Sequence, residues 1–367
     1  MTAGRKTMLV VGASGVVGRA ALEHFGQLAD WDVIGVSRRA PQGVDGARLV
    51  SLDLLDTDRC ADEFATMPAV THVIYAALSE APGLVSGWRD REQMQRNLTM
   101  LRNVLEPLCR SATSLEHISL LQGTKAYGVH LEVTPVPARE RWPRHPHENF
   151  YFLQEDHLRE RQRDGGGWTF TIWRPQVVYG ESFASPMNLI PAIGVYGAIL
   201  RARGEPLAFP GGATGLTEAI DADLLADAFE WATRAPAASN ETFNITNGDV
   251  FSWRDTWPAI ADSLGMSVGP DVPLSLAVEM PRRADEWAAI VDRHRLRSPR
   301  SLDEFVGDSF VYADMLFHYG SDVVRPPALV STIKLRQAGF GGCIDTEAMF
   351  RKWFDRFRER RLLPPID

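Results

Sequence analysis

Lysine is scarce in this chain, and the scarcity narrows the search for a catalytic cation. The 39 basic residues include only four lysines, Lys6, Lys125, Lys334 and Lys352. Lys6 precedes the first predicted strand, and Lys334 and Lys352 lie near the C-terminus. Lys125 follows the predicted strand Leu115–Leu121. Open parallel sheets bind their ligands at the carboxyl ends of the strands, so we predict that Lys125 is the functional lysine.

A tyrosine hydroxyl is the expected partner of such a lysine, because an ammonium group stabilises negative charge on a nearby oxygen. None of the seven tyrosines has a lysine four residues later, the spacing that would put both side chains on one helix face. Tyr151 begins a helical pattern directly after a Pro-rich segment, and we predict that it is the partner. Tyr127 is the first alternative and Tyr179 the second.

A glycine-rich turn follows the first predicted strand and opens a helix. Its glycines are Gly12, Gly15 and Gly18. In such a turn the first glycine permits the tight bend, the second admits a pyrophosphate, and the third lets the helix pack on the strand. Free N–H groups and the helix dipole favour phosphate there. The context predicts a dinucleotide site, with Ser14 and Val16 in its phosphate turn.

The end of the second predicted strand indicates which dinucleotide binds. The strand ends in Ser37, Arg38 and Arg39 and carries no acid there; Asp32 lies at its other end. A ribose 2′-hydroxyl usually needs an acid at this position, whereas forked arginine donors suit a 2′-phosphate. The pattern predicts NADP(H).

Further residues are expected along the cofactor. Asp53, just after the third predicted strand, is suited to accept from the adenine amino group, and helix capping by a nearby aspartate is the alternative. Lys125 and Tyr151 are expected at the nicotinamide end. The remaining predicted contacts are Leu54, Ala76, Val178, Ser185 and Met187.

Strand and helix patterns alternate through the first half of the chain, and one of the predicted strands is His72–Ala77. Such alternation predicts an α/β protein with a Rossmann-type, doubly wound parallel sheet. We expect residues 1–180 to form an NADP-binding domain and residues 181–367 mainly a smaller C-terminal substrate lobe. Residues from about 217 to 246 are expected to return to the Rossmann core. The Pro-rich segment 134–148 is predicted to be an irregular loop near the site.

The composition excludes several classes of protein. Hydrophobic residues make up 45% of the chain and charged residues 23%, which excludes a predominantly disordered, collagen-like or disulfide-scaffold chain. A net charge of −8 argues against nucleic acid as a partner, because phosphate-binding surfaces need a basic excess. The sequence contains no apolar stretch of membrane-spanning length and no signal-peptide pattern, so we expect a cytoplasmic protein without membrane partners.

Two further groups of residues are predicted to be inert. Cys60, Cys109 and Cys343 have no motif spacing and are expected to be buried thiols. His145 and His147 alternate around a proline, but no cysteine or acid cluster stands nearby. We therefore expect no metal site.

Several motifs together resemble the progesterone 5β-reductase and iridoid synthase group of atypical short-chain reductases. The resemblance covers most of the chain. The lysine motif, the tyrosine motif and a late Phe-Asn-Ile-Thr-Asn-Gly-Asp-Val-Phe-Ser-Trp run are specific, whereas the glycine turn is widespread among extended reductases. The motifs lie at Gly12–Gly18, Ser37–Arg39, Gly123–Lys125, Asn149–Tyr151 and Phe243–Trp253.

The resemblance implies an extended short-chain reductase that uses NADPH for 1,4-reduction of an activated carbon–carbon double bond. Hydride would go to the β-carbon of an enone or enal. Tyr151 would hydrogen-bond the carbonyl oxygen and stabilise the enolate, and Lys125 would hold the nicotinamide ribose. A homodimer and a small carbonyl or enone substrate are expected. The chain has Ala126 and Phe152 where the family commonly has His and Tyr, which affects the expected substrate more than the cofactor.

Three other functions stay open at this point. In a carbonyl reductase or alcohol dehydrogenase the same pair would act at a carbonyl carbon, with Tyr151 as general acid. A nucleotide-sugar epimerase or dehydratase is a second alternative, although the missing tyrosine–lysine helix and the arginine pair argue against it. A non-catalytic NADP sensor would bind the cofactor without turnover.

Overall fold

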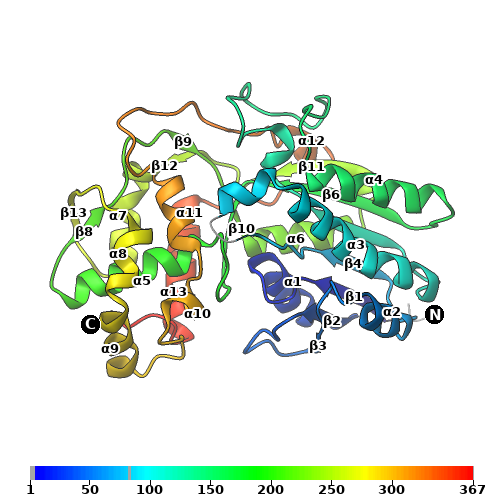
Figure 1. Ribbon diagram of the computed structural model, residues 1–367, viewed down its shortest axis with the longest axis horizontal. Helices are drawn as coiled ribbons and strands as arrows, with labels where there is room; N and C mark the ends of the chain where they lie inside the picture. The colour runs from blue at the N-terminus through cyan, green and yellow to red at the C-terminus, as the bar shows by residue number, and fades with distance from the viewer. Residues whose placement is uncertain (1–4, 82–83, 367) are drawn as a thin grey trace.

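Seven parallel strands form the central sheet (Figure 1). The computed structural model describes residues 5–81 and 84–366. The strand order is β11-β6-β5-β4-β1-β2-β3, and every neighbouring pair is parallel. This confirms the predicted Rossmann-type sheet, whose order reverses between β1 and β4, where such sheets bind ligands. The bounds are β1 (Lys6–Val11), β2 (Trp31–Ser37), β3 (Ala47–Ser51), β4 (His72–Tyr75), β5 (His117–Leu121), β6 (Thr169–Pro175) and β11 (Glu241–Ile245).

The residues of β1 explain why helices cover both faces of the sheet. Successive side chains of a strand point to opposite faces, and β1 is apolar on both. Leu9 and Val11 belong to the cluster that includes side chains of α2, α3 and α4, whereas Met8 and Val10 pack with α1 and α6. The helices are α1 (Val16–Gly26), α2 (Thr57–Ala65), α3 (Arg91–Ser111), α4 (Phe150–Arg163) and α6 (Ala222–Ala232).

A second, mostly helical lobe packs beside the sheet (Figure 1). Its centre is α5 (Leu189–Ala202), which is apolar nearly all round and buried accordingly. Aromatic side chains fill the space around it, with Trp287 stacked on Phe305 at a centroid distance of 5.4 Å. The division of the chain into two domains stays a prediction. The other lobe helices are α7 (Trp253–Ser263), α8 (Leu276–Arg282), α9 (Ala284–His294), α10 (Leu302–Phe305), α11 (Ser309–Leu316) and α13 (Thr346–Glu359).

Short elements complete the chain between these layers. Three two-stranded pairs, β10 with β7, β12 with β9 and β13 with β8, lie outside the main sheet. The 3-10 helix η2 directly follows β5 and carries Lys125. The strands are β7 (Val177–Tyr179), β8 (Leu207–Phe209), β9 (Leu216–Thr217), β10 (Ala219–Asp221), β12 (Phe251–Ser252) and β13 (Val268–Asp271), and the helical turns are η1 (Leu84–Arg89), η2 (Thr124–Tyr127), η3 (Pro236–Ala238) and α12 (Ile333–Gln337).

Residues 317–332, here called the roof strap, run from the lobe back to the sheet layer (Figure 1). The strap pairs with the Pro-rich loop, because Ala138 N donates to Leu329 O at 2.8 Å and Ser331 N donates to Ala138 O at 2.8 Å. Glu218 fixes it from below by accepting from Val330 N at 2.8 Å. The loop predicted to be irregular is therefore tied to the lobe as a roof.

Two expectations need correction. Cys60 is buried and Cys109 half-buried, but Cys343 is exposed, because it lies in the irregular link between α12 and α13 rather than in an element that faces the core. Strand β4 ends at Tyr75, two residues before its expected end, because the backbone of Ala76 and Ala77 turns past the glycine loop. Within residues 5–81 and 84–366, no helix is long and apolar enough to cross a membrane.

Candidate active site

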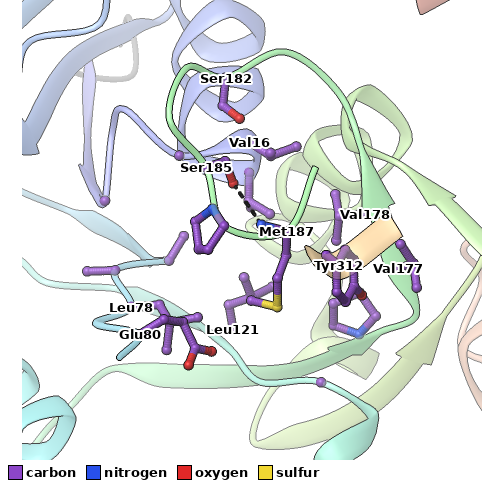
Figure 2. Close-up of a pocket in the computed structure, with 18 of the residues that line it drawn as sticks. Val16, Leu78, Glu80, Leu121, Val177, Val178, Ser182, Ser185, Met187 and Tyr312 are labelled. Carbon is purple, nitrogen blue, oxygen red and sulfur yellow. Dashed lines mark hydrogen bonds between the residues drawn. The ribbon is translucent and has the colours of Figure 1, made fainter. Parts of the chain in front are cut away.

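A cavity of about 860 Å³ lies at the carboxyl ends of the sheet strands (Figure 2). The lobe and the roof strap contribute its other walls. Of the residues predicted to hold the cofactor or to act on the substrate, all line this cavity except Gly18. Those that line it are Gly12, Ser14, Gly15, Val16, Ser37, Arg38, Arg39, Asp53, Leu54, Ala76, Lys125, Tyr151, Val178, Ser185 and Met187.

The glycine turn leaves an open cradle at the start of α1. Gly12 has φ +92°, and a Cβ there would lie 2.6 Å from Ala77 N. A Cβ on Gly18 would lie 2.1 Å from Gly12 O, so this glycine packs the helix on the strand. A Cβ on Gly15 would meet only Gly12 O at 3.4 Å, and no side chain caps the helix start. The uncapped N–H groups fit a phosphate.

The three glycines differ in what a methyl group would disturb, and this difference gives a matched test. We expect Gly18→Ala to lower the free energy of unfolding by about 1–3 kcal/mol, because its Cβ collides with backbone. Gly15→Ala should leave the stability near wild type but weaken NADPH binding about tenfold, because its methyl group would hold the pyrophosphate away from the N–H groups of the turn, at about the cost of one hydrogen bond to a charged group. Thermal unfolding and fluorescence titration with NADPH measure the two effects.

Gly167→Ala is the control, since a Cβ there has no atom within 4 Å. Equal stability of the Gly15 and Gly18 variants, or unchanged NADPH affinity in Gly15→Ala, would contradict the assignment of the cradle.

Two arginines stand at the far end of the cavity. Arg38 and Arg39 follow the last residue of β2, and both are exposed. Within the described chain no residue forms an ion pair or hydrogen bond with either guanidinium group, and both groups stand at the cavity wall. Asp32, at the other end of β2, pairs instead with Arg5 at 3.1 Å. The donor set here fits a 2′-phosphate.

Asp53 lies beside the arginine end of the cavity. Its Oδ1 accepts from Leu55 N at 3.0 Å, and its neighbour Asp56 caps helix α2 by accepting from Arg59 N at 3.1 Å. Capping therefore falls to Asp56. Asp53 remains free to meet an adenine ring, which stays a prediction.

Lys125 lies on η2 at the carboxyl end of β5. Its Nζ is 3.3 Å from Glu80 Oε1 and 4.2 Å from the centroid of the Trp88 ring. Burial lowers the pKa of Lys125, and the Glu80 carboxylate opposes that shift. The lysine is thus a nearly buried cation held between a carboxylate and an aromatic face.

Tyr151 lies in the first turn of α4. Asn149 caps this helix by accepting from Tyr151 N at 3.0 Å, and its Nδ2 donates to Lys125 O at 3.2 Å. Gln122 Nε2 donates to Tyr151 O at 3.1 Å. A Cβ on Gly123 would come within 3.1 Å of the Tyr151 hydroxyl, so this glycine makes room for it. Asn149 thereby joins the backbones of the two candidate residues, and Gln122 holds the backbone of Tyr151.

The Tyr151 hydroxyl is set up as a hydrogen-bond donor. Burial, together with the negative charge of Glu80 and with Tyr312, raises the pKa of Tyr151 well above its ordinary value. No described residue accepts or donates a hydrogen bond at this hydroxyl, which faces the cavity. It is therefore available to a ligand in its protonated form.

The rival tyrosines and lysines lie elsewhere. Tyr127 donates its hydroxyl to Asn244 Oδ1 at 2.7 Å, and Tyr179 is buried in the lobe core; neither lines the cavity. Lys334 Nζ is 2.6 Å from Glu241, and Lys352 Nζ is 2.6 Å from Asp221. Lys6 lies near Glu116 at the opposite edge of the sheet. Of the lysines and the candidate tyrosines named from the sequence, Lys125 and Tyr151 are those that line the cavity.

The cavity also contains side chains that sequence reasoning missed. Glu80 and Trp88 come from the segment after β4, and Tyr312 comes from α11 of the lobe. Figure 2 shows Glu80, Leu121 and Met187 around the same part of the pocket. Glu80 carried one usable signal, since it follows the carboxyl end of a central strand. Tyr312 carried none.

The histidines of the Pro-rich loop contact one another. His145 Nδ1 is 2.8 Å from His147 Nδ1, and His145 Nε2 is 3.1 Å from Glu132. Across residues 5–81 and 84–366, no group of three His, Cys, Asp or Glu side chains is arranged to hold a metal ion.

Comparison with known proteins places this arrangement in context. Residues 8–246 match the model of the NAD dependent epimerase/dehydratase family. The (S)-8-oxocitronellyl enol synthase of Antirrhinum majus is 30% identical over 377 residues, which cover 97% of this chain and 92% of that protein. The 3-oxo-Delta(4,5)-steroid 5-beta-reductase of Arabidopsis thaliana is 31% identical over 383 residues, with the same coverage of 97% and 92%.

Solved structures show the same fold at lower identity. UDP-glucose 4-epimerase from Bifidobacterium longum, in complex with NAD+ and UDP, aligns with a TM-score of 0.67 at 16% identity and covers 96% of this chain and 98% of that one. The Thermotoga maritima UDP-glucose 4-epimerase aligns with a TM-score of 0.66, also at 16% identity, over 96% of this chain and 99% of that one. At this identity the likeness shows the fold alone.

Proposed function

Since this chain belongs to the NAD dependent epimerase/dehydratase family, and within it to the progesterone 5β-reductase and iridoid synthase group, we propose that it reduces the carbon–carbon double bond of an enone or enal. The protein is an oxidoreductase and its cofactor is NADP(H). One observation carries the proposal: Lys125 and Tyr151, far apart in sequence, line the same cavity as the glycine cradle and the arginine pair.

The binding of NADPH is assigned to residues along one wall of the cavity. The cradle at Gly12–Gly18 would hold the pyrophosphate, and Arg38 and Arg39 the 2′-phosphate. Lys125 would hold the nicotinamide ribose with the donors that Glu80 leaves over. When bound there, NADPH supplies the hydride that adds to the β-carbon of the substrate.

Tyr151 would act on the substrate carbonyl. As the β-carbon gains hydride, the π electrons move toward oxygen and an enolate develops. The Tyr151 hydroxyl donates a hydrogen bond to that oxygen, and the Lys125 charge adds to its stabilisation. The α-carbon then takes a proton from water, so the tyrosine keeps its own proton throughout.

The state of Tyr151 supports a reduction over the oxidation of an alcohol. Oxidation of an alcohol needs the tyrosine as a phenolate base, and reduction of a ketone needs it to give up its proton. Its raised pKa disfavours the phenolate and therefore alcohol oxidation, whereas both kinds of reduction start from the hydroxyl form. Conjugate reduction needs only a hydrogen-bond donor, which is the form that this site favours.

The wall opposite the predicted cofactor residues supports a substrate with an apolar body. Side chains from the lobe and from η1 line that part of the cavity, and most are aromatic or aliphatic. A single carbonyl held by Tyr151 would orient such a molecule. The apolar lining residues there include Trp88, Phe183, Trp253, Tyr312, Met315 and Leu316.

Product identification tests the proposal. The enzyme is incubated with NADPH and a cyclic enone, an enal or a simple ketone, and with NADP and a saturated alcohol, while absorbance follows the cofactor. We expect NADPH loss with the enone or enal, giving a saturated ketone or aldehyde by mass spectrometry and NMR. Allylic alcohol as product, or NADP reduction by the saturated alcohol, would move the enzyme to carbonyl chemistry.

A homodimer and a cytoplasmic location remain predictions. Native mass spectrometry of the purified protein tests the first, and fractionation of the source cells tests the second. Binding of NADPH without turnover of any panel compound would instead favour the sensor alternative.

A further inference from the structure

Glu80 is a buried carboxylate in the cavity that the proposed reaction does not use. Only 4% of its side chain is exposed. Its Oε1 lies 3.3 Å from Lys125 Nζ, and its Oε2 accepts from Gln93 Nε2 at 2.8 Å. Gln93 is held in turn, because its Oε1 accepts from Ala81 N at 2.8 Å. Both oxygens of the carboxylate therefore have fixed partners, one of them the candidate lysine.

The surroundings of Lys125 would otherwise disfavour its charge. Its side chain is 14% exposed, so water reaches little of the ammonium group. The Trp88 ring at 4.2 Å also attracts the cation, but it carries no negative charge to balance the ammonium group. Removing one partner of a buried ion pair leaves an uncompensated charge. Glu80 is the carboxylate paired with this ammonium group.

We propose that Glu80 is a positioning residue for the reaction, which keeps Lys125 charged and oriented toward the cofactor and keeps Tyr151 in its hydroxyl form. An ammonium group has three donors, so one can bind Glu80 while two remain for the ribose. The carboxylate also offsets the positive charge of Lys125, which would otherwise stabilise the phenolate form of Tyr151. This inference rests on the proposed function for the roles of the two residues.

Other titratable groups face the pair and have to be separated from it. His130 and His147 lie in the loop after η2, and Tyr312 faces the site from α11. Burial lowers the pKa of His130 to about 4 and also lowers that of His147, so both imidazoles are uncharged across the alkaline range. Burial and Glu80 raise the pKa of Tyr312. Arg89, at the end of η1, acts on His130 through its charge.

Glu80→Gln tests the inference, because the amide keeps the shape of the side chain and the contact with Gln93 but removes the charge. Glu80 raises the pKa of Lys125 and also that of Tyr151. Without it both fall, so the form with both groups protonated is lost at a lower pH. We expect the alkaline limb of kcat/KM to move down by about one pH unit or more.

Cofactor affinity gives a second readout that needs no turnover. Fluorescence titration with NADPH from pH 6 to 10 should show a difference in affinity between wild type and Glu80→Gln that widens toward the alkaline end, where the variant binds more weakly. If the product panel failed, this measurement would still test Glu80. Glu148→Gln is the control, since Glu148 is exposed, pairs with Arg91 of α3, and lies outside the cavity.

Superimposed pH profiles of Glu80→Gln and wild type, in both measurements, would overturn the inference. A uniform loss of activity with an unmoved limb would do the same, because it would indicate only a structural role. If Glu80→Gln does not fold, Glu80→Asp replaces it: the carboxylate is withdrawn by one methylene, and the limb should move in the same direction by a smaller amount. An unmoved limb in Glu80→Asp would then decide against the inference.

Discussion

Replacing Tyr151 with phenylalanine should lower kcat for enone reduction by about 100- to 1,000-fold, the usual cost of one lost oxyanion donor. The stability of the folded protein should change little. The hydroxyl has no hydrogen-bond partner among the described residues, and the ring stays packed with Phe150 at a centroid distance of 4.4 Å. Steady-state kinetics measures kcat, and thermal unfolding with NADPH titration checks that fold and cofactor binding are intact.

Tyr127→Phe is the matched control for this experiment. Its hydroxyl donates to the buried Asn244, so its removal should cost about 1 kcal/mol of stability and leave kcat near wild type. Tyr151→Phe should therefore lower kcat with little change in stability, and Tyr127→Phe should lower the stability with little change in kcat. Full activity of Tyr151→Phe would show that the assignment of the oxyanion donor is wrong.

The double variant Arg38→Ala/Arg39→Ala should raise the KM for NADPH by about 100-fold or more, since each hydrogen bond to a charged group contributes about 1.5–3 kcal/mol. The KM for NADH should change little, because NADH lacks the 2′-phosphate. The fold should be unaffected, as both guanidinium groups are exposed and have no partner among the described side chains. Initial rates with the two cofactors give the ratio.

Arg5→Ala controls for the general loss of a positive charge. Arg5 is exposed, pairs with Asp32 at the opposite end of β2, and lies away from the cavity. Its replacement should leave both KM values unchanged. If the double variant raised both KM values equally, the arginines would serve the common part of the dinucleotide and not the 2′-phosphate.

Most of the scaffold could be predicted because its signals are local. The apolar runs of β1 and β5 and the glycine spacing each depend on a few neighbouring residues, and the rule that parallel strands present their carboxyl ends together placed Lys125. The same rule applies to Glu80, but Glu80 lies several residues beyond the end of β4, so its place in the site was not predicted. Because β4 ends at Tyr75, earlier than predicted, the residues after it lie farther from the end of the strand than the sequence pattern indicated.

The rest of the site depends on tertiary packing. Tyr312 reaches the cavity only because α11 packs against α5 and α8 in the lobe, and no spacing in the sequence links it to Tyr151. Exposure of Cys343 likewise depends on the path of an irregular link. Residue types and short-range periodicity carry no information about such encounters.

The joint made by Asn149 has a consequence for how related proteins diverge. Where one helix carries both the tyrosine and the lysine, the helical backbone fixes the distance between the two side chains, and both belong to the same short segment. Here Asn149 binds Lys125 O with one group and Tyr151 N with the other, so the chain between residues 126 and 148 does not set their spacing. We therefore expect changes of length or composition in that segment to leave the Lys125–Tyr151 geometry in place and to alter the roof of the cavity instead.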